Sequence, residues 1–529
     1  MSTIHLDALM QYGSTRRAAE ALGLAYTTFF DRLSKERKAL SAIQNAEEPI
    51  VDPVRYTNKP RYYIFSCAVK GATVHEDFLK NLEAYAAHLG ADIAIGPLTS
   101  TGRQRYTEYD PEDFDPAIVD YIHEEAIVIG NKIRFSPELN LTPTMVKPLQ
   151  GLQTYTKKLW GIFPHTKISL ETVATHKDRP TKFIATTGAI THPHYSPTKA
   201  GFRAHFDHVH GAIIVEVTKT GVWFRHLTPA NALDGTFYDL GYVVKNGKVL
   251  NNKEGVRAIV YGDIHIELID KDVAKATWGI GFQSHKDSLS LVDWIKPQTQ
   301  VFHDLLDMTA ANYHELDNMF RRYERWNKGK NSVHGDLEQA MEFLRQVTGD
   351  HIESVVVDSN HDYFIQQWLL KFDPAAKEDF DNIETFYKLK IAVLRSIREG
   401  FPLPFLETIL REKFPGEETL LDNITFLKVD DSFEIDNIEC GWHGHRGANG
   451  RRGSRHAFKF VTEKSTIAHL HSPAIESGCH VVGTSSSLDL GYNSGPSSWA
   501  HTHGIIYPHG GRTLITMSDS KFWAAQGIS

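Results

Sequence analysis

The sequence has few cysteines, no long apolar run and no excess of positive charge. Only three of its 529 residues are cysteines, Cys67, Cys440 and Cys479, too few for a disulfide framework and typical of a reducing compartment. No apolar stretch is long enough to cross a bilayer. The first residues lack the basic and then apolar pattern of a secretory signal. These absences favour a cytoplasmic protein.

The charge balance limits how the chain could contact nucleic acid. Its 57 Lys and Arg residues against 65 Asp and Glu give a net charge of -8, so the chain as a whole is not a polycation. Contact with nucleic acid would depend on local basic patches, and a DNA compaction protein is disfavoured. The length allows two or three domains with a large core.

Residues 1–45 predict a small helical module. An amphipathic turn at residues 6–10 is followed by a short helix at 16–22, a turn at Gly23 and a helix at 26–40. This order resembles the helix-turn-helix of DNA-binding proteins, whose last helix enters the major groove. The resemblance implies that five residues face DNA, namely Thr27, Thr28, Asp31, Arg32 and Lys35. A docking module for self-association or for a protein partner is an equally weighted alternative.

A linker rich in proline and charge is predicted at 46–60, and a separate α/β domain at 61–252. The expected elements are strands at 61–69, 91–95, 126–129, 182–186, 211–217 and 221–227, a helix at 76–89 and a hairpin at 243–249. The domain contains five clustered histidines, His192, His194, His205, His208 and His210. They lack a zinc spacing with cysteines, which favours structural or substrate-contact roles over a second metal centre. The sequence assigns no chemistry to this domain.

An apolar run at 258–260 leads through Gly262 into two metal-ligand side chains, Asp263 and His265. Alternate residues of an extended chain point to one side, so both side chains can face the same ion. Such a pair is common by chance, and it indicates a metal site only together with further ligand residues downstream.

Four more groups of polar residues come at or near the ends of apolar runs. They are Asp304-x-x-Asp307, Asn360-His361-Asp362, His443-Gly-His445 and His469-x-His471. The ordered succession resembles the calcineurin-like metallophosphoesterases over roughly residues 255–515. The resemblance implies a metallophosphoesterase β-sandwich flanked by helices at 253–529. Two helices at 379–414, split at 400–404, predict a helical insertion at about 373–420 that forms a cap beside the site.

The resemblance also implies a role for each residue of the site. The implied metal ligands are Asp263, His265 and His471 for a first ion, Asp304 as a bridge, and Asn360, His443 and His469 for a second. His361 is implied as a general acid or as a donor to the transition-state phosphate, and Asp307 as the acceptor that orients it. Two divalent ions are expected, Mn²⁺ first, with Mg²⁺, Zn²⁺ or Fe²⁺ as alternatives.

The sequence departs from the family beside the ligands. His303, Ser359 and Ala468 stand where the family usually has glycine, which puts the loop geometry in question but leaves the ligand set intact.

Two assignments have alternatives. His443 is preferred to His445 because it comes first after the strand at 438–440. His469 and His471 are preferred to a similar pair at 501–503 because Ser-Pro comes directly after them, as in the family.

Two basic segments suggest a polyanionic substrate. The loop at 441–459 has several glycines, no acid and five basic residues, Arg446, Arg451, Arg452, Arg455 and Lys459. Arginines of this kind are candidate substrate-phosphate contacts, with a solvated loop as the alternative. Residues 319–330 combine five basic residues, one acid and three aromatics, a composition that suits unstacked bases, although a solvated helix face is slightly preferred.

The runs at 443–450 and 492–499, with the N-terminal module and the arginine loop, resemble phage-encoded DNA-exonuclease-like phosphoesterases, including the pre-early proteins of T-five-like bacteriophages. The resemblance implies a manganese-dependent DNase, oligomeric and active in the infected bacterial cytoplasm. It implies roles in host-DNA degradation and phage DNA transfer, with phage or host proteins as further partners. Two alternatives stay open: a nucleotide or phosphoprotein phosphatase of the same fold, and a non-catalytic DNA-transfer scaffold.

Overall fold

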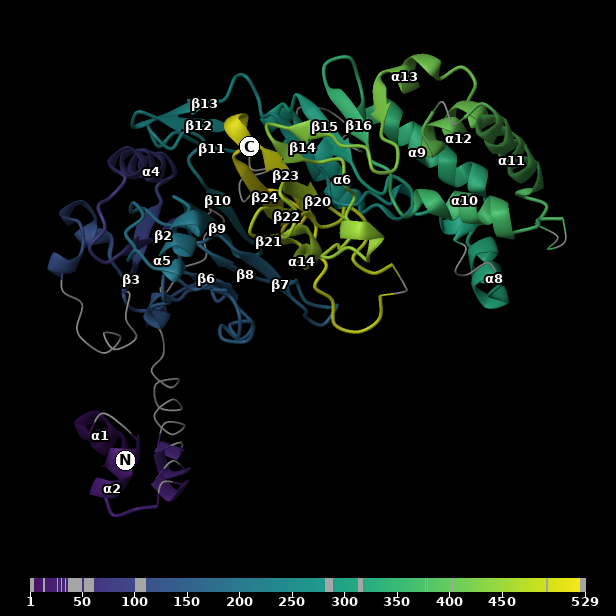
Figure 1. Ribbon diagram of the computed structural model, residues 1–529. Coiled ribbons are helices and arrows are strands. Elements are labelled where there is room, and N and C mark those ends of the chain that lie inside the picture. Colours follow the sequence, from purple (N-terminus) through teal and green to yellow (C-terminus); the bar gives the residue numbers. More distant parts are fainter. Residues whose placement is uncertain are drawn as a thin grey trace. The chain divides into compact units, whose positions relative to one another are not determined.

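The structure is a computed structural model (Figure 1). It describes residues 4–12, 15–25, 27–29, 31–33, 35–36, 50–51, 61–99, 111–280, 289–312, 317–375, 377, 379–400, 403–490 and 493–523. The chain divides into two compact units, Met1–Pro53 and Val54–Ser529. Among the described helices, none combines the length and apolar character that crossing a bilayer requires.

The first unit is a small helical cluster with its own core. It contains α1 (Ile4–Tyr12), α2 (Thr15–Ala21), helical segments within 27–36 and the short strand β1 (Ile50–Val51). The buried residues that form its core are Ala8, Ala18, Ala19, Phe29 and Leu33. Gly23 makes the turn with a φ of 64°. The order of elements agrees with the predicted one, and the candidate DNA contacts Thr27, Thr28, Asp31, Arg32 and Lys35 are exposed. The helix-turn-helix assignment stays a prediction. Residues 37–49 and 52–60 lie outside the described residues, and they include the end of the predicted helix at 26–40 and most of the predicted linker at 46–60.

The largest sheet of the second unit is assembled from two distant parts of the chain. Its strands run in the order β4-β5-β6-β8-β7-β21-β22-β20-β19-β18. Their bounds are β4 (Ile127–Ile129), β5 (Ile133–Phe135), β6 (Trp160–Phe163), β7 (Leu170–Val173), β8 (Lys182–Thr186), β18 (Glu434–Ile435), β19 (Ile438–Glu439), β20 (Lys464–Ile467), β21 (Ala474–Glu476) and β22 (Cys479–Val481). β21 pairs antiparallel with β7, placing Ala474 opposite Glu171, so residues 61–252 contribute strands to the same sheet as residues 434–481. The predicted domain division at residue 252 stays a prediction.

A second sheet, in the order β10-β9-β2-β3, contains the predicted strand-helix-strand unit. Its elements are β2 (Arg61–Val69), α4 (Glu76–Leu89), β3 (Asp92–Leu98), β9 (Ala212–Val217) and β10 (Val222–Leu227), and α5 (Lys199–Asp207) precedes β9. A third sheet comprises β11 (Phe237–Asp239), β12 (Tyr242–Lys245) and β13 (Lys248–Asn251). Asn246 and Gly247, both at positive φ, make the predicted hairpin turn between β12 and β13.

A buried ion pair joins the second and third sheets. Arg225 of β10 holds Asp239 of β11 with two hydrogen bonds, Nε to Oδ1 at 2.6 Å and a terminal nitrogen to Oδ2 at 2.7 Å. The same guanidinium also contacts Glu216 of β9. All three charged side chains are buried, so removing any one of them would leave buried charge without a partner and destabilise the fold.

The fourth sheet, in the order β17-β16-β15-β14-β23-β24, carries the candidate site. Its strands are β14 (Ala258–Val260), β15 (Thr299–Phe302), β16 (Glu353–Val356), β17 (Ile424–Phe426), β23 (Thr502–Ile506) and β24 (Arg512–Thr516). The first four are parallel, and β23 and β24 form the predicted terminal hairpin. The fold also has α6 (Lys271–Trp278), α7 (Leu291–Ile295), α8 (Met319–Asn327), α9 (Val333–Val347), α10 (Asp362–Lys371), α11 (Ile383–Arg398), α12 (Phe405–Lys413), α13 (Glu418–Asp422) and α14 (Arg455–Phe458).

Short 3-10 helices complete the second unit. They are η2 (Pro111–Asp113), η3 (Pro116–Tyr121), η4 (Pro137–Leu139), η5 (Ile266–Leu268), η6 (Thr309–Ala311), η7 (Ala448–Gly450) and η8 (Pro508–Gly510).

The fourth sheet is buried on both faces. Ile259 of β14 packs in a core with residues of α9 and α10, whereas its neighbours Ala258 and Val260 pack in a core with residues of the largest sheet. This alternation is what an extended strand produces. Figure 1 shows α9 to α13 grouped on the side of β16, and α11 and α12 are the two predicted helices of the insertion. The mixed α/β class is confirmed, and the metallophosphoesterase sandwich stays a prediction.

Candidate metal centre

The site begins where three parallel strands end. Asp263 follows β14, Asp304 follows β15 and Asn360 follows β16. The carboxyl ends of parallel strands meet at one edge of a sheet, the usual place for a site in an α/β fold. His443 follows β19, and a loop between β20 and β21 brings two further histidines from the largest sheet.

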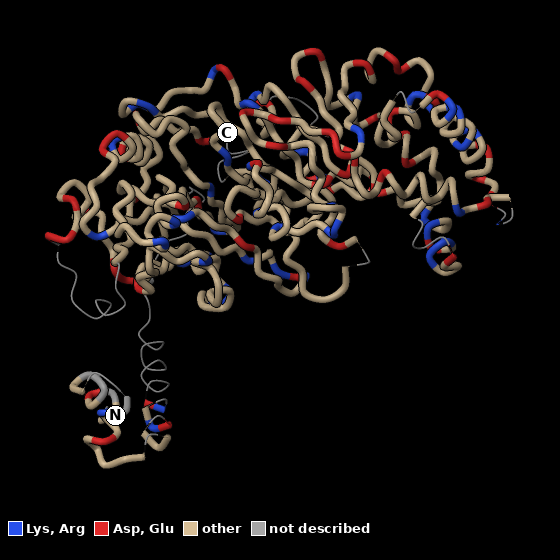
Figure 2. Tube along the Cα trace, in the orientation of Figure 1, with Lys and Arg blue, Asp and Glu red and all other residues tan. Residues whose placement is uncertain are grey.

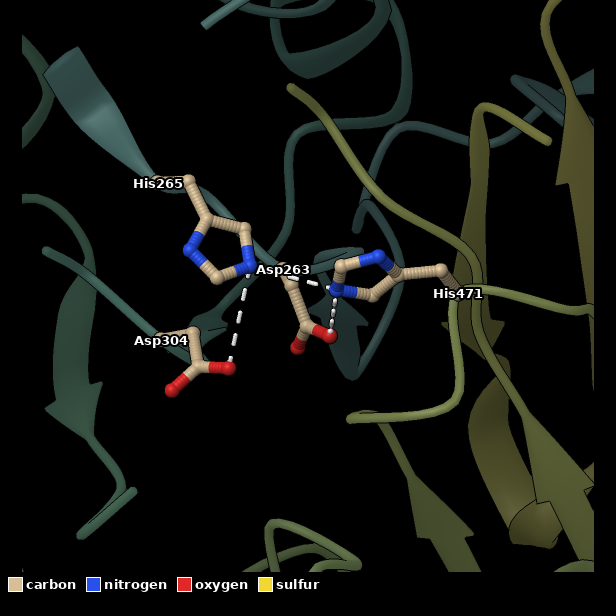
Figure 3. A group of neighbouring side chains, drawn as sticks. All are labelled: Asp263, His265, Asp304 and His471. Carbon is tan, nitrogen blue, oxygen red and sulfur yellow. Dashed lines mark hydrogen bonds and ion pairs between the residues drawn. The ribbon is translucent and has the colours of Figure 1, made fainter. Parts of the chain in front are cut away.

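One group of side chains comprises Asp263, His265, Asp304 and His471, all buried, with ligand atoms within 4.8 Å of one another. His471 Nε2 lies 2.9 Å from Asp263 Oδ2 and 3.1 Å from His265 Nε2. His265 Nε2 also lies 3.7 Å from Asp304 Oδ2. Figure 3 shows these atoms converging on one point. Two imidazole nitrogens and two carboxylates facing one another form a donor set that could hold a divalent metal ion.

A second group comprises Asp304, His443 and His469, again with ligand atoms within 4.8 Å. His443 Nε2 lies 3.1 Å from Asp304 Oδ2 and 2.9 Å from Asn360 Oδ1. Asp304 therefore belongs to both groups, as expected of a carboxylate predicted to bridge two metal ions. All seven implied ligands lie in this one cluster.

The backbone of the cluster is unusual at four ligands. His265, Asp304, His469 and His471 have φ values of 45°, 43°, 69° and 54°. This left-handed region is costly for residues with a side chain and is found mainly at functional sites. Gly262 is needed for a different reason, since a Cβ there would lie 2.8 Å from the backbone of Gly483 and Thr484.

Asp307 contacts two histidines rather than the one predicted. Its Oδ1 lies 3.4 Å from His265 Nδ1 and 3.5 Å from His361 Nδ1, and its backbone oxygen lies 3.1 Å from His361 Nδ1. A carboxylate on Nδ1 leaves Nε2 of the same ring to face a metal or a substrate. Glu267, which the sequence does not single out, accepts hydrogen bonds from the backbone N–H groups of Asp307 at 2.7 Å and Met308 at 2.9 Å. No recognisable motif marks Glu267.

Burial and neighbouring charge set the protonation states. Burial lowers the pKa of His265 and of His469 to about 4, so both rings are neutral at pH 7, as metal ligation requires. Burial would also lower the pKa of His443, but the carboxylates of Asp304 and Asp263 raise it to about 9. Burial would raise the pKa of Asp263, but His471 and His443 hold it at about 2.

The alternative histidines lie outside the groups. Burial lowers the pKa of His445 to about 3, and neither of its ring nitrogens has a hydrogen-bond partner among the described residues. His501 Nε2 lies 2.9 Å from the Ser486 carbonyl oxygen. His503 lies 3.1 Å from Gly262 N and 3.0 Å from the Thr277 hydroxyl. His501 and His503 therefore contact backbone and hydroxyl groups instead of facing the candidate metal site.

The three departures from family glycines do not separate the ligands. His303 and Ala468 are buried beside the cluster. The Ser359 backbone N–H donates to Asp362 Oδ2 at 3.2 Å, at the start of α10.

The basic loop has two parts with different surroundings. The Arg446 guanidinium lies 5.0 Å from the ring centroid of Tyr363, two residues after His361. Arg451 and Arg452 are exposed. Arg455 instead forms ion pairs with Glu171 at 3.4 Å and Glu476 at 3.6 Å. A substrate-phosphate role for all four stays a prediction, with Arg446 the best placed.

The histidines near β9 form contacts with one another. His208 lies 2.7 Å from the Tyr195 hydroxyl and 2.9 Å from the Thr191 carbonyl oxygen. His75, which lies outside the predicted histidine cluster, packs its ring against His192 and His210, with centroids 5.1 and 4.9 Å away. Within the described part of the chain, no potential metal-holding group includes them.

Comparison with known proteins supports a phage relationship. No protein-family model matches the sequence. Over 504 residues, which cover 93% of this chain and 89% of the relative, the sequence is 33% identical to "Protein A1" of Escherichia phage T5. The chain therefore belongs to the family of phage T5 Protein A1.

Proposed function

We propose that this protein is a two-metal-ion phosphodiesterase that hydrolyses DNA. The observation that carries the proposal is the pair of largely buried side-chain groups that share Asp304. A single carboxylate between two sets of histidines is what a pair of divalent ions, Mn²⁺ first, would require.

The donor atoms fit such ions. Asp263 Oδ2 is buried and lies 2.9 Å from His471 Nε2, and the Nε2 atoms of His265 and His471 face each other at 3.1 Å. Asp263, His265 and His471 would hold one ion and Asn360, His443 and His469 the other. When bound, divalent ions supply Lewis-acid chemistry at a phosphodiester.

His361 is the proposed general acid. Its Nδ1 lies 3.1 Å from the Asp307 carbonyl oxygen, which fixes the ring and leaves Nε2 to donate a proton to the leaving oxygen. Its ring centroid lies 4.5 Å from that of His265, so the proton would be delivered beside the metal cluster.

DNA is the proposed substrate because exposed arginines follow a metal ligand and because the chain belongs to a phage protein family. Arginines beside a metal centre can clamp a phosphate with two hydrogen bonds. We propose that the protein serves in host-DNA degradation and phage DNA transfer in the bacterial cytoplasm, as an oligomer that docks on DNA through its N-terminal unit.

The test is DNA digestion by the full chain with Mn²⁺. Asp304→Ala should lower the rate on the order of a thousandfold, because both groups lose their common carboxylate. Asp92→Ala, which removes an aspartate whose side chain is 72% exposed, is the matched control and should digest DNA normally. Intact DNA alongside rapid turnover of cyclic nucleotides or phosphopeptides would reject the proposal.

A further inference from the structure

Helix α8 presents an apolar surface that no described part of the chain covers. Met319, Phe320, Tyr323 and Trp326 are 69%, 80%, 65% and 59% exposed. Large apolar residues exposed together on one short helix mark a binding surface. The rings of Tyr323 and Trp326 lie 5.8 Å apart, three positions along the helix from one another.

The two sides of α8 line two different cavities. Met319, Tyr323 and Trp326 line one of about 410 Å³. Arg321, Arg325 and Lys328 line another of about 290 Å³. The helix thus separates an aromatic-lined hollow from a cationic one, and Arg325 borders both.

The cationic cavity borders a residue that contacts the metal cluster. Asp307 forms part of its wall, and the carboxylate of Asp307 lies 3.4 Å from His265 and 3.5 Å from His361. A ligand in this cavity therefore lies against Asp307, the residue that contacts the candidate general acid.

The charge of the segment indicates the kind of ligand. Residues 319–330 contain five basic residues and one acid, Glu324, and Glu324 is paired with Arg321 and Lys328. Figure 2 shows the basic residues concentrated on α8. Aromatic rings beside arginines and lysines bind a strand whose bases are unstacked and whose backbone is anionic.

We propose that α8 binds single-stranded DNA and leads it through the cationic cavity to the metal cluster. The inference rests on the proposed function, since it names the form of DNA that the same site receives. A duplex would keep its bases stacked on one another, and could not use Tyr323 and Trp326 as stacking surfaces.

The experiment measures binding apart from hydrolysis. A fluorescent oligothymidylate and a duplex of equal length are titrated with the full chain in EDTA, and fluorescence anisotropy gives each Kd. The double variant Tyr323→Ala/Trp326→Ala should raise the Kd for the single strand by roughly fivefold to a hundredfold per stacked base, with little change for the duplex. Arg321→Gln/Lys328→Gln should weaken single-strand binding and flatten its salt dependence.

Matched controls are available on other helices. Phe206→Ala removes an aromatic ring that is 81% exposed on α5, with the Arg203 guanidinium 5.8 Å from its centroid. Lys388→Gln/Arg398→Gln removes two exposed charges from α11. Both should leave the Kd for the single strand unchanged. Thermal unfolding and Mn²⁺ affinity verify that each variant is folded with an intact cluster.

The outcomes separate this inference from the proposed function. Weakened single-strand binding in the α8 variants supports it, even if the wild-type chain digests no DNA, a result that would reject only the proposed function. DNA digestion by wild type with an unchanged single-strand Kd in the α8 variants overturns the inference alone. It is also overturned if these variants change the oligomeric state instead, since α8 would then be a face for a second copy of the chain.

Discussion

His443 should couple metal binding to pH. Its Nε2 lies 3.1 Å from Asp304 Oδ2, and the carboxylates of Asp304 and Asp263 overcome the effect of burial and raise its pKa to about 9. A protonated imidazole cannot ligate a metal, so an ion must displace this proton. His265 and His469, with pKa values of about 4, have none to lose at neutral pH.

The size of the effect follows from the pKa. With a value of about 9 for His443, apparent Mn²⁺ affinity should rise about tenfold per pH unit, or about a hundredfold from pH 6 to pH 8. About one proton should be released per chain at pH 7. Because this pKa lies above its ordinary 6.5, the His443–Asp304 pair stabilises the metal-free fold fully below pH 6.5, and that contribution is lost as pH rises through 9.

Isothermal titration calorimetry with Mn²⁺, in buffers of different ionisation enthalpy, counts this proton. His443→Gln should weaken binding and abolish the dependence between pH 6 and 8. His303→Gln is the control, because burial lowers the pKa of His303 to about 3 and its ring, 5.6 Å from that of His443, carries no proton in this range. A wild-type affinity that does not change between pH 6 and 8 would refute the reasoning.

Three further changes test other parts of the structure. Glu267→Ala should destabilise the protein by about 2–5 kcal/mol in urea unfolding, because the backbone N–H groups of Asp307 and Met308 lose their buried acceptor; equal stability would show that this side chain is dispensable. His361→Ala should lower the rate of DNA hydrolysis by about 10²–10⁴ in steady-state assays with little change in Mn²⁺ affinity, and full activity in infected cells would favour a non-catalytic scaffold. Arg225→Leu should cost about 3–5 kcal/mol in thermal unfolding, because two buried carboxylates lose their partner, and a smaller loss would mean that they become hydrated or protonated.

The grouping of the candidate ligands could be predicted because their order along the chain resembles that of a known family. Apolar runs ending in Asp263, Asp304 and Asn360 become adjacent parallel strands, and their ends meet for a geometric reason. The local geometry differs from the prediction. Strand alternation predicts that Asp263 and His265 share a side, but β14 ends at Val260 and His265 has a φ of 45°. A bend in the backbone, rather than an extended chain, brings these two side chains together.

Other features had no local signal. The two contacts of the Asp307 carboxylate depend on the positions of His265, directly before η5, and His361, directly before α10. The pairing of β7 with β21 joins residues about 300 positions apart. The sequence of neither short strand indicates which strand it pairs with. Such pairing is decided by tertiary packing, which periodicity cannot report. The aromatic and basic composition of α8 could be read from the sequence, but the two cavities beside the helix could not be predicted from it.

The pairing of β7 with β21 has a consequence for how this protein can evolve. His469 and His471 lie in the loop between β20 and β21, so the strand that anchors one end of that loop is itself anchored by residues 170–173. A recombination breakpoint near residue 252 would join β7 from one parent to β21 from another and shift the loop that carries both histidines. We expect the regions before and after residue 252 to be inherited together and to tolerate exchange only as a pair.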